Sequence, residues 1–240
     1  PDKVEKDMWL NFSPEEKQLY LANLAQVNEQ LQQQLELEQV DSILIIAMMT
    51  RLRQICCEPR MLYENYKGES TKFTMCLELI ETLKENGKKV LLFSSFTSIF
   101  DSFIEEFNQR GIKYHMITGA VDKKKRKEEV DAFQSDDSDV FLISLKAGGT
   151  GLNLTKAQAV IHYDPWWNVS AQNQATDRAY RIGQTKNVLV YQLLMRNTIE
   201  AKIYEMQKRK KEMSDIFVEN SNGGISTLSK EELRDLFSME

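Results

Sequence analysis

The segment from Gln174 to Gln184 holds the residues best suited to chemistry. On a helix, Gln174, Arg178 and Arg181 have the spacing i, i+4, i+7 and lie on one face. Guanidinium groups beside a glutamine suit a polyphosphate, because arginine keeps its charge at any working pH and its planar donors match phosphate oxygens. The same spacing also fits a solvated helix face with local ion pairs, so spacing by itself leaves both interpretations open.

A glycine-rich segment, Ser144 to Leu154, directly follows a predicted strand. Its glycines, Gly148, Gly149 and Gly151, allow backbone N–H groups to approach a ligand at the carboxyl edge of a parallel sheet, where open α/β folds bind ligands. The segment lacks both the spacing of a Walker A phosphate loop and the third glycine of the dinucleotide fingerprint. A tight turn that binds nothing is the alternative.

Aromatic and basic residues supply three further candidates. Trp166 and Trp167 lie in a predicted strand-to-helix loop, where they could stack on bases or ribose, although tryptophan is also common in cores. The run Lys123–Lys127 resembles a phosphate patch, but residues 128–131 add three carboxylates to the same helix, so a solvated helix face is favoured. The cluster Lys208–Lys211 is more purely basic and could lie along a nucleic-acid backbone.

The elements that would position these residues alternate between strands and helices from Lys89 onward. Short apolar, β-rich runs predict strands over residues 90–94, 114–117, 140–144, 159–163 and 188–193. Helical patterns lie between them, over residues 98–110, 123–133 and 170–181. Near-continuous apolar strands separated by helices predict an α/β fold, with a parallel sheet covered by helices on both faces.

The segments on either side of this region are predicted to be helical. Helices are expected over residues 14–40, after a capping box that begins at Ser13, and over residues 41–55 and 71–85. After the last strand, a charged helix is expected over residues 198–213, followed by a break at Gly223 and Gly224. A second capping box, beginning at Ser229, predicts a short final helix.

Composition narrows the class of protein. The three cysteines and two histidines argue against a disulfide framework or a metal site and favour a reducing, intracellular compartment. No apolar run reaches the roughly 18 residues needed to cross a bilayer, and no signal peptide is visible, so no membrane association is expected. Taken over the whole chain, the net charge of −5 argues against a nucleic-acid partner. Residues 140–212, however, carry 11 basic and 5 acidic side chains, and this local charge of +6 can hold phosphate.

Taken in order, several of these segments resemble the second RecA-like lobe of a SWI/SNF-type ATPase, which translocates on double-stranded DNA and belongs to helicase superfamily two. The resemblance rests on five blocks: Val90–Thr97, Ile117–Ala120, Phe141–Leu154, Asp164–Asn168 and Gln174–Gln184. It spans residues 51–205, and Leu52–Cys56 resembles the helical insertion that precedes this lobe. The implied fold is a RecA-like parallel sheet flanked by helices, with extra N- and C-terminal helices.

The resemblance also implies a domain division and a location. Residues 1–70 would be the helical end of the first lobe with an insertion helix, residues 71–205 the RecA-like lobe, and residues 206–240 bracing helices. Cys57 and Glu58 replace an Asn-His pair that is common in eukaryotic relatives, which favours a bacterial source and a cytoplasmic over a nuclear location.

By the same resemblance, Arg178 and Arg181 would be arginine fingers that reach ATP held mainly by the first lobe, with Gln174 beside them. Gly149 and Gly151 would bring backbone near the nucleotide. Residues that match contacts to the DNA backbone are Ser94, Ser95, Thr118, Gly119, Ser144 and Lys146, and Trp167 matches a tryptophan that lies against a DNA strand. Backbone contacts of this kind position the protein without reading bases.

Other expectations concern the missing half of the enzyme. The sequence contains no phosphate loop and no D-E-x-H motif, so ATP with Mg²⁺ would need a first lobe that also holds the metal. We therefore expect the complete protein to be a DNA-dependent ATPase and the isolated chain to be inactive. Expected partners are duplex DNA, the first lobe and, through the long helices, other proteins.

Two rival functions remain. An RNA-directed helicase lobe of the same superfamily is disfavoured by the Ala147–Gly149 and Asp164–Asn168 blocks. A non-catalytic interaction scaffold is disfavoured because it would not need Gln174, Arg178 and Arg181.

Overall fold

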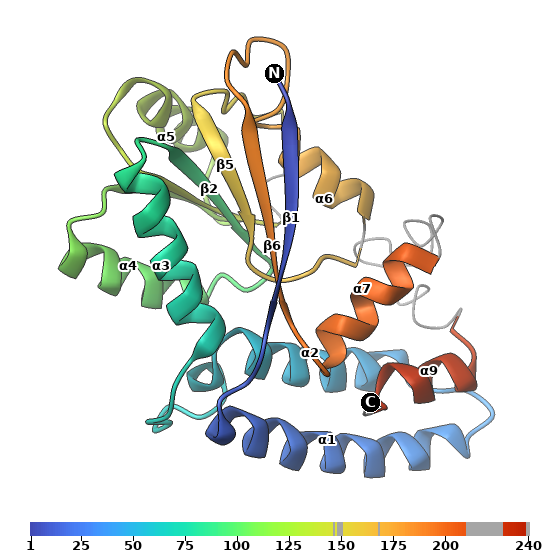
Figure 1. Cartoon of the computed structure of the whole chain (residues 1–240). Coiled ribbons are helices and arrows are strands. Elements are labelled where there is room, and N and C mark those ends of the chain that lie inside the picture. Colours follow the sequence, from blue (N-terminus) through green and yellow to red (C-terminus); the bar gives the residue numbers. More distant parts are fainter. Residues whose placement is uncertain (146, 148–150, 168, 210–227, 239–240) are drawn as a thin grey trace. The chain divides into compact units, whose positions relative to one another are not determined.

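The chain divides into two units. Unit 1 comprises Pro1–Met8, Thr74–Asp164 and Ala171–Leu193, and unit 2 comprises Trp9–Phe73, Pro165–Ser170 and Leu194–Glu240. The structure is a computed structural model, and it describes residues 1–145, 147, 151–167, 169–209 and 228–238 (Figure 1).

A six-stranded parallel sheet forms the centre of unit 1 (Figure 1). In spatial order its strands are β1 (Lys3–Leu10), β6 (Val188–Met195), β5 (Ala157–His162), β2 (Lys89–Ser94), β4 (Val140–Ser144) and β3 (Tyr114–Ile117). Parallel pairing is in register from Val90↔Val140 to Ser94↔Ser144 between β2 and β4. Nearly every side chain of β2, β4 and β5 is buried, as expected for strands with helices on both faces. The parallel sheet predicted from the apolar runs is therefore confirmed.

In the described part of the chain, helices lie on both faces of the sheet (Figure 1). Adjacent side chains of β3 lie on opposite faces of the sheet. Tyr114 contacts Phe107 of α4 (Ile99–Arg110), whereas His115 contacts Phe133 of α5 (Lys123–Ser135), so α4 and α5 cover different faces. Helix α3 (Thr71–Glu85) shares the α4 face through an ion pair between Glu81 and Arg110 at 3.0 Å.

Helix α6 (Val169–Thr176) lies on the α5 face. Its Thr176 hydroxyl lies 2.9 Å from Nε2 of His162, and the His162 ring stacks on Phe93 of β2. His162 is wholly buried, and this burial lowers the pKa of its imidazole to about 3, so the ring is neutral in the folded protein.

Strand β1 was not predicted, because residues 3–10 were included in the helical first part of the chain. The first five side chains of β1 are exposed, so no apolar pattern marks them as a strand. Instead, β1 is held by backbone pairing along β6, as in the hydrogen bond from the Val188 N–H to the Asp2 carbonyl at 3.0 Å.

Unit 2 is helical, with α1 (Pro14–Leu35), α2 (Ser42–Cys57), the short 3₁₀ helix η1 (Pro59–Met61), α7 (Ile199–Arg209) and α9 (Lys230–Leu236). Both predicted capping boxes are present, Ser13 with Glu16 and Ser229 with Glu232. Helix α1 ends five residues earlier than predicted, and residues 210–227, with the expected break at Gly223 and Gly224 and the end of the Lys208–Lys211 cluster, lie outside the described residues.

A buried ion pair lies in the interior of unit 2. The ammonium of Lys72, at the start of α3, lies 2.6 Å from each carboxylate oxygen of Glu200, at the start of α7. Both side chains have no exposed surface. Glu200 also accepts the Met195 backbone N–H at 3.0 Å, so the carboxylate is well hydrogen-bonded within the protein.

Candidate functional site at the carboxyl edge of the sheet

The carboxyl ends of β5, β2, β4 and β3 lie at one edge of the sheet in unit 1, and the segments predicted to bind a ligand follow them. Ser94 ends β2, Ser144 ends β4, and Thr118 follows β3. Since open α/β folds bind ligands at this edge, the fold gathers these residues at the expected position.

Asp164 joins the ends of β5 and β2. It is fully buried, and one of its carboxylate oxygens accepts the Ser94 hydroxyl at 2.6 Å. The other oxygen accepts the Ser95 hydroxyl, and the Ser95 backbone N–H donates to the same carboxylate at 3.2 Å. Asp164 therefore fixes the loop that leaves β2.

Two of the serines predicted to contact DNA are buried. Ser94 is 0% and Ser144 2% exposed, and the Ser144 hydroxyl accepts the Ala147 N–H at 3.3 Å. A backbone hydrogen bond of 3.1 Å from Leu145 N–H to the Ser94 carbonyl joins the two loops. In this structure both hydroxyls hold loops in place, and a direct contact of either with phosphate stays a prediction.

Other predicted contact residues are more accessible. Ser95 and Thr118 are half-buried, and Gly119 is exposed. The Thr118 carbonyl accepts the Val121 N–H at 3.2 Å in the turn that leads from β3 to α5. Lys146 and Gly149 lie outside the described residues.

The predicted helix over residues 170–181 is wrong beyond Thr176, where α6 ends. Gln174 is exposed on α6, while Arg178 and Arg181 lie in the turns that follow, so the three do not share a helix face. Tertiary hydrogen bonds replace the helical ones here, because the Arg178 carbonyl accepts the Leu154 N–H at 3.1 Å.

Gln184 holds these turns in place and was not predicted to have a role. Its side-chain amide is largely buried and donates to the carbonyls of Thr155, Ala157 and Ala179 at 2.9–3.0 Å. Gly183 adopts a φ of 103°, a conformation that favours glycine and that a continuing helix excludes. The sequence signal for this role is the position of Gln184 at the end of the segment that carries Arg178 and Arg181.

The arginine segment and the glycine-rich segment meet in unit 1. Nη1 of Arg181 donates to the Leu152 carbonyl at 3.0 Å, next to Gly151, whose φ is 27°. Nε of Arg178 is buried and has no hydrogen-bond partner among the described residues. An unpartnered guanidinium N–H beside a glycine-rich segment can donate a hydrogen bond to an anionic ligand.

The two tryptophans predicted to stack on nucleic acid differ. Trp166 is 4% exposed and belongs to the core, whereas Trp167 is half-buried. The Arg53 guanidinium of α2, itself 7% exposed, lies 5.6 Å from the Trp167 ring centroid, and its Nη2 donates to the Pro165 carbonyl at 3.5 Å. Arg53 thus braces Trp167 within unit 2, a contact that residue spacing does not reveal.

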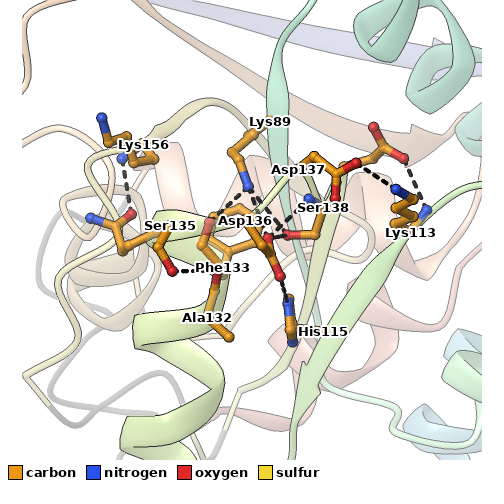
Figure 2. A network of polar contacts seen from close by, with 12 residues as sticks. Lys89, Lys113, His115, Ala132, Phe133, Ser135, Asp136, Asp137, Ser138 and Lys156 are labelled. Atoms are coloured by element: carbon orange, nitrogen blue, oxygen red, sulfur yellow. Dashed lines mark hydrogen bonds and ion pairs between the residues drawn. The ribbon is translucent and has the colours of Figure 1, made fainter.

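The amino edge of the sheet carries a separate polar network (Figure 2). The ring nitrogens of His115 lie 2.7 Å from a Glu129 oxygen and 2.6 Å from an Asp136 oxygen. Burial by itself would raise the pKa of Asp136, but hydrogen bonds from Ser138 and His115 hold it well below its usual value. Lys89 donates to the Phe133 carbonyl at 2.7 Å, so the network fastens the end of α5 to the sheet.

Among the described residues, none of the helices is long and apolar enough to cross a membrane.

Comparisons with known proteins agree with the parallel sheet and flanking helices described above. Residues 71–183 match the family described as "Helicase conserved C-terminal domain". The chain is 37% identical over 242 residues to a Mycoplasma pneumoniae protein described as "Uncharacterized ATP-dependent helicase", covering 99% of this chain and 23% of that protein. It spans 23–26% of the length of the first three curated relatives that it matches.

Two solved structures from Sulfolobus solfataricus are similar over the whole chain. The "SWI2/SNF2 ATPase core in complex with dsDNA" has a TM-score of 0.82 and 30% identity, covering 100% of this chain and 51% of that one. The "SWI2/SNF2 ATPase C-terminal domain" has a TM-score of 0.79 and 26% identity, covering 100% of both chains. The predicted RecA-like α/β fold is therefore confirmed.

Proposed function

Because the chain belongs to the SWI/SNF-type helicases, whose conserved C-terminal domain it carries over residues 71–183, we propose that it forms the second motor lobe of an ATP-driven translocase on double-stranded DNA. The observation that carries this proposal is the meeting of the arginine and glycine-rich segments in unit 1, through the hydrogen bonds from Arg181 to the Leu152 carbonyl and from the Leu154 N–H to the Arg178 carbonyl. ATP-driven closure and opening of two lobes would shift the grip on DNA in small steps.

Arg178 and Arg181 would face ATP that is bound mainly by the first lobe. Bound ATP supplies the phosphoryl group whose transfer drives the cycle. Their guanidiniums would neutralise the charge that develops on that group, and the unpartnered Nε of Arg178 supports this role. Gln174 would assist them from α6, and Gly149 and Gly151 would place backbone near the nucleotide.

Mg²⁺ would accompany ATP and be held by the first lobe. The described residues contain no group of three His, Cys, Asp or Glu side chains that could hold a metal ion. Because the sequence has no phosphate loop, we expect the isolated 240-residue chain to hydrolyse no ATP.

Duplex DNA would lie along the carboxyl edge. Ser95, Thr118 and Gly119 would contact its phosphates, with Lys146 and the buried Ser94 and Ser144 contributing from the same loops. Trp167, braced by Arg53, would lie against one strand. The likeness to a SWI2/SNF2 core solved with double-stranded DNA supports this arrangement.

The test is Arg181→Ala in the complete protein. An arginine finger contributes about 10³–10⁵-fold to turnover, so DNA-stimulated ATP hydrolysis should fall to the unstimulated level while DNA affinity stays nearly unchanged. Arg196→Ala is the matched control, because Arg196 is an exposed arginine of unit 2 that no proposed contact uses. Unchanged turnover in Arg181→Ala would end the arginine-finger assignment.

The same assay separates the rival functions. Stimulation by RNA rather than duplex DNA would favour an RNA-directed helicase, and a complete protein with no ATPase activity would favour an interaction scaffold.

We also propose the domain division at residues 70 and 205, protein partners bound through the helices, and a bacterial cytoplasmic location, the last supported by the Mycoplasma relative.

A further inference from the structure

The start of helix α5 carries an unusual concentration of positive charge. Its first five residues are all cationic, and four of them, Lys123, Lys124, Lys125 and Lys127, are exposed. We call these four side chains the α5 lysine surface. Arg126 differs, because it is half-buried and its Nη2 donates to the Val121 carbonyl at 3.3 Å. None of the four lysines forms an ion pair with a carboxylate among the described residues.

The order of charges along α5 opposes the stability of the helix. The amino end of a helix carries partial positive charge and favours acidic residues, yet the first turn of α5 contains none. Lys123 and Lys127 are also four residues apart, so like charges face each other on one side of the helix. Only the Asp122 side chain, which accepts the Lys125 N–H at 2.8 Å, caps this end favourably. Helix stability therefore gives no reason for the lysines to be there.

Two lysines at the amino edge of the sheet differ from the α5 lysine surface in having carboxylates close to their ammonium groups. At the amino edge, Lys113 pairs with Asp137, and Lys89 lies 3.5 Å from Asp136 (Figure 2). The α5 lysine surface lies at the opposite, carboxyl edge, where α5 begins six residues beyond the end of β3. Lys113 and Lys89 are thus neutralised within the protein, whereas no carboxylate among the described residues pairs with the α5 lysine surface.

The position of the α5 lysine surface continues the row of proposed DNA contacts. Strand order places Thr118 and Gly119 at the end of β3, the outermost strand, with the Ser95 loop two strands away on β2. At roughly 4.8 Å between neighbouring strands, this row extends about 10 Å. Phosphates along one DNA strand recur about every 3.4 Å of helix axis, so a duplex that reaches Thr118 presents further phosphates beyond it.

We infer that the α5 lysine surface binds the phosphate backbone of duplex DNA and lengthens the contact row of this lobe, an inference that rests on the proposed function. Lysine ammonium groups act as point charges, so the contact is independent of base sequence. It releases counterions and therefore weakens as salt concentration rises.

The experiment compares two double variants of the complete protein. Lys123→Gln with Lys127→Gln removes two charges from the α5 lysine surface. Lys156→Gln with Lys186→Gln removes two exposed lysines that precede β5 and β6 at the amino edge. The dissociation constant for a mixed-sequence duplex is measured from 50 to 200 mM KCl, by fluorescence anisotropy.

For the α5 variant, we expect the slope of log affinity against log salt to become shallower by about 2, since each phosphate contact contributes about 0.9. The control variant should keep the wild-type slope. The melting temperature of the α5 variant should equal or exceed that of the wild type, because like charges at a helix amino end have been removed. An α5 variant with the same slope as the control overturns the inference.

Further outcomes separate this inference from the proposed function. If the wild-type protein neither binds duplex DNA nor shows stimulated ATPase activity, the proposed function fails and the inference fails with it. If the wild type binds DNA and the α5 variant matches the control, only the inference fails. Loss of binding to a poly-glutamate peptide with an unchanged DNA slope would instead assign the surface to an acidic protein partner.

Discussion

Replacing Lys72 with methionine should destabilise unit 2 strongly. The Lys72 ammonium lies 2.6 Å from both oxygens of Glu200, and neither side chain has exposed surface. Methionine fills similar volume but leaves the Glu200 carboxylate buried without its counter-charge. Breaking one partner of such a pair costs about 3–5 kcal/mol in the free energy of unfolding. For a chain of this size, the melting temperature should fall by about 10 °C.

A second substitution identifies the cause. Glu200→Gln in the Lys72→Met background removes the stranded charge, while the amide oxygen still accepts the Met195 N–H. The double variant should regain most of the lost stability, which gives a coupling energy of about 3 kcal/mol in the double-mutant cycle.

Tryptophan fluorescence during urea unfolding is a suitable assay, because all three tryptophans, Trp9, Trp166 and Trp167, belong to unit 2. A loss below 1 kcal/mol in Lys72→Met, or a double variant no more stable than that single variant, would refute the argument. The first result would mean that the carboxylate reaches water, and the second that lost packing, rather than stranded charge, sets the cost.

Two further predictions concern the sheet. Asp164→Asn should leave either the Ser94 or the Ser95 hydroxyl facing an amide NH2 instead of an acceptor oxygen, at a cost of about 1.5–3 kcal/mol. It should also raise the DNA concentration needed for half-maximal ATPase stimulation, whereas Asp164→Glu, which keeps both carboxylate oxygens, should have a smaller effect. An unchanged stimulation curve in Asp164→Asn would contradict the positioning role. His162 has a pKa of about 3 in the folded protein, below its unfolded value near 6.5, so the unfolded state takes up a proton first as the pH falls. Its contribution to stability, complete above pH 6.5, should be lost at about 1.4 kcal/mol per pH unit down to pH 3, and urea titrations should show that His162→Gln loses correspondingly less over this range.

The sequence predicts the centre of the fold well, because burial on both faces leaves a plain signal. Strands β3 and β4 begin and end where the apolar runs do, and every residue of β4 is buried. Strand β1 gave no such signal, because its exposed side chains contribute little to its formation and backbone pairing along β6 holds it. An edge strand of this kind is recognised only from its partner.

The candidate site could likewise be predicted only in part from the sequence. Residue types identified the arginine and glycine-rich segments, which meet in the structure, but helical spacing extended α6 too far. The tertiary hydrogen bonds that end it, from Leu154 to the Arg178 carbonyl and from Gln184 to three carbonyls, join positions that local periodicity does not relate. Burial of Ser94 and Ser144 was likewise hidden, because a serine that ends a strand fits both a solvated and an internal hydroxyl.

The inverted order of charges on α5 gives ionic strength opposite effects on folding and on binding. Added salt screens the repulsion among Lys123, Lys124, Lys125 and Lys127, so it should stabilise the free lobe. The same salt weakens attraction to a polyanion. The repulsion among these lysines is therefore strongest in the free protein at low ionic strength. DNA phosphates and dissolved salt are two alternative ways of reducing it.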